Sequence, residues 1–277
     1  MKNPSHETLA PTPGGAVEEA AGTEAAWDET EPREPTPAAV SPHIGVLTSI
    51  KTWVFDLDNT LYPADCDLWP KIDQRITLYL AHLFGLDGLS ARALQKYYYQ
   101  RYGTTLRGLM EEYGIGPEEF LRFTHDVDRS SLLPNIELAA AISALPGRKL
   151  ILTNGSREHA LRTAEALGLK ALFDEIFDIA AADFLPKPAA ATYERFFDRH
   201  EVDPVHAVMF EDLARNLIIP HERGMRTVLV VPKPGQKDYR ESFEMPGKAV
   251  PPHIDFVTDD LALFLNGATF VPNDGER

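Results

Sequence analysis

Short, mostly apolar segments recur along this chain, and stretches with helical patterning separate them. The segments span residues 52–55, 149–152, 176–179, 207–210, 227–231 and 253–257. A strand that is apolar on both faces has to be covered on both, which is the situation of a parallel sheet between two layers of helices. We therefore predict an α/β fold whose core is a Rossmann-like parallel sheet.

One connection in this series is much longer than the others. About 90 residues separate Asp58 from Lys149, whereas a simple crossover between parallel strands takes about a dozen residues or more, usually one helix. Part of the excess has helical character, because Ile72, Ile76 and Leu83 recur at helical spacing. The sequence therefore predicts a helical insertion directly after the first strand.

Further helix signals fill this insertion. Ser90 is expected to cap a helix over residues 91–102, and Pro117 is expected to open one over 118–123. Ligands of open α/β sheets bind beyond the carboxyl ends of the strands, so an insertion at that edge would form a cap over the site. We predict the following organisation: a core of residues 46–62 and 146–277, with a helical cap of residues 63–145, whose last helix spans 138–145.

Residues 1–45 differ in composition from the rest of the chain. They are rich in Pro, Ala and Glu and have hardly any periodic apolar position. Such a segment cannot bury enough apolar surface to offset the entropy lost on ordering. We predict that it is a disordered acidic tail.

Charge and composition exclude several classes of function. A net charge of −15 repels phosphate backbones and argues against binding nucleic-acid polymers. The single cysteine, Cys66, excludes a Cys-based zinc site. The sequence has no unbroken apolar run long enough to span a membrane, and its N-terminus lacks the apolar stretch of a signal peptide. We therefore expect a cytoplasmic protein that does not associate with membranes.

Polar side chains follow the predicted strands at their carboxyl ends. Two acidic clusters at one edge of a sheet repel each other, and a divalent cation held by carboxylate oxygens, usually Mg²⁺, removes that repulsion. A lysine, a hydroxyl and turn amides nearby supply charge and donors for an oxyanion. This combination indicates phosphoryl transfer. Its members are Asp56 and Asp58, then Thr153, Asn154 and Gly155, then Lys187, and finally Glu211 and Asp212 with Asn216 one helical turn on.

Asp56 and Asp58 are two residues apart, so in an extended strand their side chains point the same way. One of them can attack phosphorus as a nucleophile. The other can give a proton to the leaving oxygen and then take one from water. The spacing alone does not assign the two roles.

The motif Asp56-Leu57-Asp58-Asn59-Thr60, followed in order by Thr153, Lys187 and Glu211-Asp212, resembles the haloacid-dehalogenase-like hydrolases, a superfamily dominated by Mg²⁺-dependent phosphatases. The resemblance implies that Asp56 is the nucleophile, forming an aspartyl-phosphate, and that Asp58 is the acid/base. It implies that Thr153 and Lys187 hold the transferring phosphoryl group. The implied Mg²⁺ ligands are Asp56, the backbone carbonyl of Asp58, and Asp212, with Glu211 direct or through water; Asn216 is expected to orient Lys187 or a ligand.

The sequence is also similar to a narrower branch, the pyrimidine 5′-nucleotidases. This likeness rests on residues 54–63, 102–109 and 216–231. It implies a nucleoside 5′-monophosphate as substrate. The segment from Tyr102 to Arg107, where two predicted cap helices meet, is the expected substrate-facing loop of the cap. The alternatives are another small phosphate ester (phosphoglycolate or a sugar phosphate), a phosphomutase, and a catalytically idle binding module.

Two other chemistries fit the residues less well. A dehalogenase that attacks carbon needs neither Mg²⁺ nor an acid two residues after its nucleophile, so Asp58 and the pair Glu211-Asp212 argue against it. A phosphorylated receiver domain has paired acids, Thr and Lys, but it needs only about 120 residues and no cap, which is far less than the 277 residues present here.

Overall fold

The computed structural model describes residue 47 and residues 49–245 and 249–267. The predicted disordered tail over residues 1–45 lies outside the described residues. Among the residues that are described, no helix is long and apolar enough to cross a membrane.

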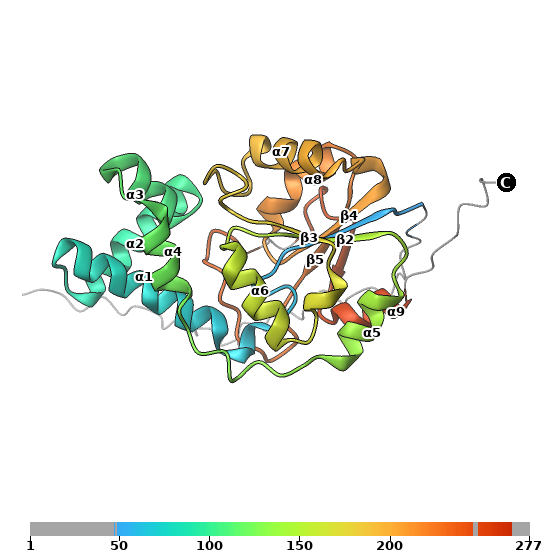
Figure 1. The fold of residues 1–277 in the computed structure, drawn as a ribbon, viewed down its shortest axis with the longest axis horizontal. Coiled ribbons are helices and arrows are strands. Elements are labelled where there is room, and N and C mark those ends of the chain that lie inside the picture. The colour runs from blue at the N-terminus through green and yellow to red at the C-terminus, as the bar shows by residue number, and fades with distance from the viewer. Residues whose placement is uncertain (1–46, 48, 246–248, 268–277) are drawn as a thin grey trace, which may run out of the picture. The chain divides into compact units, whose positions relative to one another are not determined.

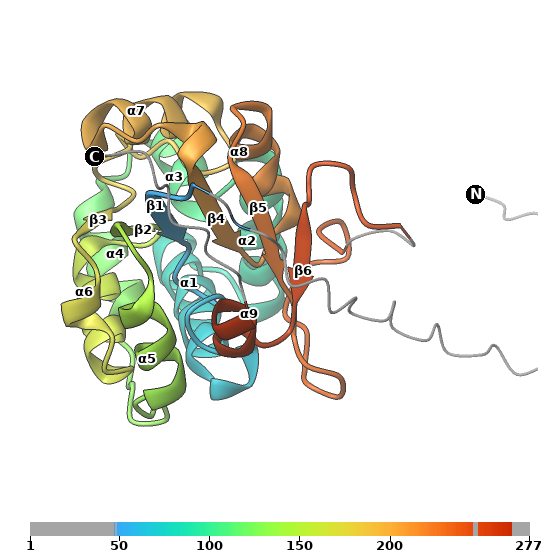
Figure 2. The same ribbon diagram turned by 90° about the vertical axis from the view of Figure 1, so that its right-hand side faces the viewer.

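A six-stranded parallel sheet forms the core, with the strand order β3-β2-β1-β4-β5-β6 (Figures 1 and 2). This confirms the predicted α/β fold, because all six predicted strands are present in one sheet. The strands are β1 (Thr52–Phe55), β2 (Arg148–Leu152), β3 (Glu175–Phe177), β4 (Ala207–Glu211), β5 (Arg226–Val230) and β6 (Phe256–Thr258). The central strands β1 and β4 are buried at every position, as a sheet covered on both faces requires.

Two strand boundaries differ from the prediction by two residues or more, and hydrogen bonds in turns explain both. β3 ends at Phe177, because the carboxylate of Asp178 accepts hydrogen bonds from the backbone N–H groups of Arg157 and Ala181 and holds the chain in a turn. β6 begins only at Phe256, because the residues before it form a turn closed by the N–H of Ile254 on the carbonyl of Pro251.

Five helices lie between β1 and β2, which confirms the predicted insertion after the first strand. They are α1 (Leu68–Phe84), α2 (Gly88–Tyr102), α3 (Thr105–Tyr113), α4 (Pro117–His125) and α5 (Ile136–Ala144). The other helices in the described part of the chain are α6 (Arg157–Ala166), α7 (Ala190–His200), α8 (Ile218–Glu222) and α9 (Leu261–Gly267). Short 3₁₀ turns lie at Ala64–Cys66, Lys170–Leu172, Pro204–His206 and Ala214–Leu217. Helices α7 and α8 cover one face of the sheet, and α5, α6 and α9 cover the other (Figure 1).

The inserted helices belong to two hydrophobic clusters. Helices α1 to α4 enclose a cluster of their own that includes Leu80, Tyr98, Leu109 and Phe120. Helix α5 instead packs against α9, and its residues Leu138–Ile142 contribute to the main core beside the sheet. The chain therefore packs against the core already at α5, before it enters β2; the predicted cap boundary at residue 145 stays a prediction.

The start of α2 differs from the prediction. Asp87, not Ser90, is its N-cap, because the Asp87 carboxylate accepts hydrogen bonds from the N–H groups of Leu89 and Ser90. Helix α3 was not predicted. It begins directly after α2, with the hydroxyl of Thr104 accepting from the N–H of Arg107.

Gly108 is where α3 packs tightly against α2. A Cβ atom added at Gly108 would lie 2.7 Å from the ring of Tyr98, which is itself fully buried. We expect Gly108→Ala to lower the free energy of unfolding by about 1–3 kcal/mol, as overpacking of a core does. Chemical denaturation measures this loss. Gly88→Ala, at a helical glycine whose added Cβ meets nothing within 4 Å, is the control; equal stability of the two variants would contradict the packing of α3 on α2.

Candidate active site

A cavity of about 150 Å³ opens at the carboxyl ends of β1, β2 and β4. Helices α1 to α4 contribute its other wall, with apolar and aromatic side chains such as Trp69 and Phe120 and polar ones such as Asp73 and Gln95. The core contributes nearly every residue that the sequence singled out: Asp56, Asp58, Thr153, Asn154, Gly155, Lys187, Glu211, Asp212 and Asn216. The sheet topology therefore brings together residues that lie up to 160 positions apart, as Asp56 and Asn216 do.

A buried lysine and three carboxylates form the centre of this cavity. The Nζ of Lys187 donates to Asp56 Oδ1 at 2.6 Å, to Glu211 Oε2 at 2.7 Å and to the carbonyl of Leu152 at 2.9 Å. Asp56, Glu211 and Asp212 each offer a carboxylate oxygen, and these oxygens lie within 4.8 Å of one another. Lys187 is only 1% exposed, and none of the three carboxylates is more than 9% exposed.

The carboxyl groups of this cluster outnumber its one positive charge, and the pKa values of two of them are raised. Burial, and after it the charge of Glu211, raises the pKa of Asp56 to about 7, although Lys187 opposes the rise. Burial, and after it the charges of Glu211 and Asp56, raise the pKa of Asp212 well above its usual range. A single ammonium group does not balance three buried carboxylates, so the cluster favours an added cation. Convergent carboxylate oxygens are the ligands that Mg²⁺ prefers.

The turn after β2 forms a polar cradle beside Asp56. The hydroxyl of Thr153 accepts a hydrogen bond from the N–H of Gly155 at 2.9 Å. The side chain of Asn154 bridges to the loop that carries Lys187: its Oδ1 accepts from the Lys187 N–H at 2.8 Å, and its Nδ2 donates to the Lys187 carbonyl at 3.3 Å. Asn154 thereby fixes the backbone at Lys187.

Asp58 has two partners that the sequence did not reveal. Its Oδ1 accepts from the hydroxyl of Tyr62 at 2.6 Å and lies 2.8 Å from Nε2 of His159. Burial alone would raise the pKa of Asp58, but the interaction with His159 and the hydrogen bond from Tyr62 outweigh it and lower that pKa to about 2. One signal for His159 was present in the sequence, because it lies three residues after Ser156, the N-cap of α6, and thus at the carboxyl edge of the sheet.

Three of the predicted site residues, Asn216, Tyr102 and Arg107, do not contact the central cluster of Lys187 and the carboxylates through any hydrogen bond or ion pair among the described residues. Asn216 is buried in the cavity wall, but its Oδ1 has no hydrogen-bond partner among the described residues. The hydroxyl of Tyr102 donates to Glu112, and Arg107 pairs with Glu111. Neither Tyr102 nor Arg107 is among the described residues that line the cavity; their neighbours Thr104, Thr105 and Leu106 line it instead. The roles of Asn216, Tyr102 and Arg107 stay predictions.

The connection between β5 and β6 also reaches the inserted helices. Glu241 pairs with Lys96 of α2 at 2.7 Å. One carboxylate oxygen of Glu244 accepts from the hydroxyl of Tyr99 at 2.5 Å and lies 2.8 Å from Arg215. This segment therefore closes one side of the cavity.

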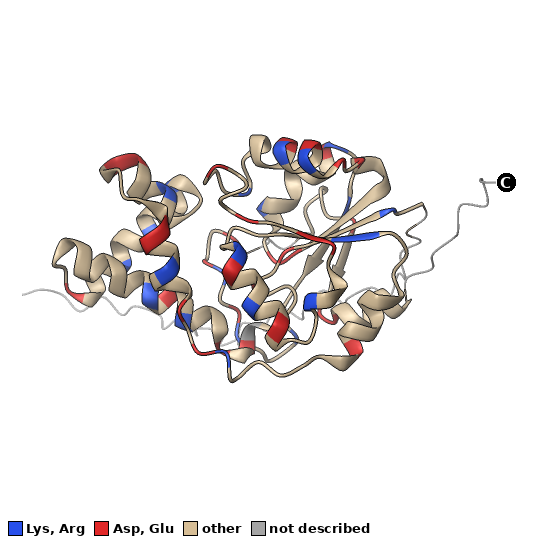
Figure 3. Cartoon of the chain, viewed as in Figure 1, with Lys and Arg blue, Asp and Glu red and all other residues tan. Residues whose placement is uncertain are grey.

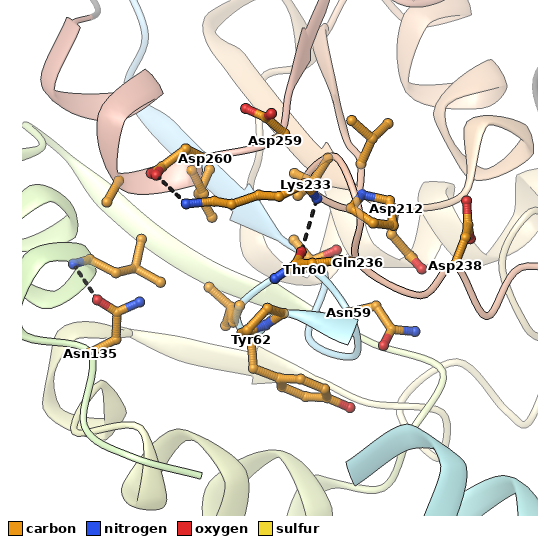
Figure 4. Close-up of a pocket in the computed structure, with 18 of the residues that line it drawn as sticks. Asn59, Thr60, Tyr62, Asn135, Asp212, Lys233, Gln236, Asp238, Asp259 and Asp260 are labelled. Atoms are coloured by element: carbon orange, nitrogen blue, oxygen red, sulfur yellow. Dashed lines mark hydrogen bonds and ion pairs between the residues drawn. The ribbon is translucent and has the colours of Figure 1, made fainter. Parts of the chain in front are cut away.

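A second, more polar cavity of about 200 Å³ adjoins the first and shares Asn59, Asp212, Tyr239 and Arg240 with it (Figure 4). Figure 4 shows Lys233 extending toward Asp260, with which it pairs at 2.7 Å.

Away from the cavities, acidic and basic residues are interspersed along α6 and α7 (Figure 3).

A parallel sheet with helices inserted after its first strand, together with carboxylates and a buried lysine at its carboxyl edge, defines a hydrolase core. The chain belongs to the haloacid dehalogenase-like hydrolases, since that family's model matches residues 50–218. The superfamily inferred from the motifs is therefore confirmed.

Individual relatives add little to the family assignment, because each match is either partial or distant. Phosphate metabolism protein 8 of Saccharomyces cerevisiae is 30% identical over 138 residues, which are 46% of this chain and 42% of the yeast protein. The match thus spans less than half the length of that relative. The crystal structure of a dehalogenase with an intermediate complex has a TM-score of 0.50 at 18% identity and covers 80% of this chain and 98% of its own. A HAD phosphatase from Thermococcus onnurineus has a TM-score of 0.46 at 18% identity, covering 69% and 90%. The likeness to the dehalogenase structure, at 18% identity, bears on the fold alone.

Proposed function

We propose that this chain is a Mg²⁺-dependent phosphomonoester hydrolase that works through an aspartyl-phosphate on Asp56. The observation that carries the proposal is the convergence of Asp56, Glu211 and Asp212 around Lys187 at the base of a cavity. Fixed positive charge and oxygen ligands for a metal are what a transferring phosphoryl group requires. The similarity to a phosphate metabolism protein supports the same chemistry.

Asp56, Asp212 and the backbone carbonyl of Asp58 would hold the Mg²⁺, with Glu211 contributing directly or through water. The donor set fits this ion, because it consists of hard oxygen atoms in an under-neutralised cluster. Bound there, Mg²⁺ supplies positive charge that screens the nucleophile and the phosphoryl oxygens from each other. Lys187 adds a second positive charge, and the Thr153 hydroxyl and the turn amides supply further donors for the phosphoryl oxygens.

In the first half of the reaction, a carboxylate oxygen of Asp56 attacks phosphorus, and the bond from phosphorus to the ester oxygen breaks. Asp58 gives its proton to that oxygen. This step requires the protonated form of the Asp58 carboxyl, and the negative charge of a bound phosphoryl group favours that form. In the second half, Asp58 takes a proton from water, the water oxygen attacks phosphorus, and the bond to Asp56 breaks to release phosphate.

The substrate that we propose is a pyrimidine nucleoside 5′-monophosphate. The likeness of residues 54–63, 102–109 and 216–231 to the pyrimidine 5′-nucleotidases supports this choice. The cavity wall adds planar and apolar side chains, including Trp69, Tyr99 and Phe120, that suit a flat base. Sugar phosphates, phosphoglycolate and phosphomutase chemistry are the alternatives.

A phosphate-release screen over nucleotides and small phosphate esters tests this proposal. We expect UMP and CMP to be hydrolysed with a higher kcat/KM than AMP and GMP, because a mismatched base leaves buried polar groups unpaired. Substitutions within residues 102–107 should change the nucleotide preference more than the rate on p-nitrophenyl phosphate. Equal rates on all four nucleotides, or a clear preference for a sugar phosphate or phosphoglycolate, would overturn the nucleotidase assignment but not the phosphatase.

A further inference from the structure

His159 connects the proposed acid/base residue to an arginine. It lies in the first turn of α6, and its side chain is 0% exposed. Its Nε2 is 2.8 Å from Asp58 Oδ1, and its Nδ1 is 2.8 Å from Nη2 of Arg129. The two ring nitrogens therefore have different partners, a carboxylate on one side and a guanidinium on the other.

These partners assign the tautomer of the ring. A guanidinium group carries only donors, so Arg129 donates and Nδ1 of His159 has to accept. A ring that accepts at Nδ1 has its hydrogen on Nε2. His159 therefore donates from Nε2 to Asp58 Oδ1. Arg129 excludes the other tautomer, in which the hydrogen is on Nδ1 and Nε2 cannot donate to Asp58.

Both groups are fixed in place by further contacts. Arg129 also donates to the carbonyls of Val127 and His125, at 2.9 and 3.2 Å, and to the hydroxyl of Thr163 at 3.3 Å. The ring of His125 stacks on that of His159, with centroids 4.5 Å apart and an interplanar angle of 18°. The imidazole thus has little freedom to rotate.

The effect on Asp58 is to distinguish its two oxygens. Oδ1 receives two donors, from Tyr62 and His159, whereas Oδ2 accepts no hydrogen bond from the part of the chain that the structure describes. A Cβ atom built on Gly155 would come within 3.8 Å of Oδ2, so this oxygen lies beside the turn of Thr153 to Gly155. Oδ2 is therefore available on the side where a phosphoryl group would bind.

We propose that His159, with its tautomer set by Arg129, is a positioning residue that holds Asp58 Oδ1 and presents Oδ2 for proton exchange with the leaving oxygen. The inference rests on the proposed phosphatase function. In the step concerned, the bond from phosphorus to the ester oxygen breaks, and that oxygen takes the proton from Asp58 Oδ2. The electron pair of the broken bond stays on the leaving oxygen.

Two aryl esters of nearly the same shape test this role. p-Nitrophenolate is a weak base and leaves without a proton, whereas phenolate is a stronger base and gains from protonation. We expect His159→Leu to lower kcat/KM for phenyl phosphate about tenfold more than for p-nitrophenyl phosphate, because positioned proton transfer contributes about 10²–10⁴-fold. His159→Gln offers both an N–H donor and an acceptor. It should return the ratio of kcat/KM for phenyl phosphate to kcat/KM for p-nitrophenyl phosphate most of the way to the wild-type value. Glu158→Gln, at an exposed neighbouring position on α6, should leave the ratio unchanged.

The ratio of the two esters is measured on one preparation, so it does not depend on the fraction of protein that is folded. Arg129→Met, which frees Nδ1, should move the ratio in the same direction as His159→Leu. An equal loss on both esters would show a purely structural role and overturn the inference, as would an unchanged ratio in an active enzyme. Wild-type protein that hydrolyses neither ester in the presence of Mg²⁺ would instead overturn the proposed function, and the inference with it.

Discussion

Replacing Asp56 by asparagine is expected to lower turnover by at least about 10³-fold, because the variant keeps the shape of the side chain but loses the nucleophile of a covalent route. The fold should be retained. Asparagine still offers an acceptor to Lys187, and Lys187 keeps its hydrogen bonds to Glu211 and to the carbonyl of Leu152. Burial raises the pKa of Asp56 to about 7, so removing this carboxyl also relieves repulsion within the cluster.

Phosphate release from p-nitrophenyl phosphate, measured together with a thermal melt, checks this expectation. Asp203→Asn is the matched control, since Asp203 is an exposed residue before β4, at the opposite end of that strand from Glu211. A folded Asp56→Asn protein with turnover close to that of the wild type would remove Asp56 from the mechanism.

Chelation of divalent metal is expected to abolish activity, and added Mg²⁺ is expected to restore it. Three buried carboxylates around one ammonium group leave the site negatively charged, so a phosphate dianion is repelled until a cation is present. Ca²⁺ should restore little, because it takes more ligands at longer distances than the octahedral geometry of Mg²⁺ allows.

A binding readout separates metal affinity from catalysis. Mg²⁺ should raise the melting temperature of the wild type, since a ligand that binds only the folded state stabilises it. The same addition should raise the melting temperature of Asp212→Asn much less, and that of Asp203→Asn as much as the wild type. Full activity in excess chelator would point to chemistry that needs no metal and would contradict the proposed function.

Much of the fold was predictable because its strands are buried on both faces. A strand such as β1 is apolar at all but its first position, and this pattern is hard to mistake. The insertion was visible from the length between Asp58 and Lys149 alone. Helix α3 was missed because only Gly103 and Thr104 separate it from α2. The residues after Tyr102 were therefore assigned to a loop between two cap helices. The cap at Asp87 was missed because Ser90 is also a good N-cap residue.

The candidate site was predictable only in part. Asp56 and Asp212 follow strands, Glu211 ends one, and Lys187 lies on the loop after another. The rule that ligands bind at the carboxyl edge therefore brought them together in advance. The contacts of Asp58 depend instead on how helices pack. Arg129, for example, lies in the connection between α4 and α5, and no local pattern places it beside His159.

Lys187 has no unused hydrogen. An ammonium group carries three N–H bonds, and here they are directed to Asp56, Glu211 and the carbonyl of Leu152. A phosphoryl oxygen can gain a donor from Lys187 only by taking the place of one of these acceptors. The Leu152 carbonyl belongs to a strand, and the second oxygen of Glu211 is held by the N–H of Leu213. Asp56 is the acceptor that loses its charge when it becomes an acyl phosphate, so in the proposed reaction the lysine passes from the carboxylate to the phosphoryl group as the new bond forms, and returns when phosphate leaves.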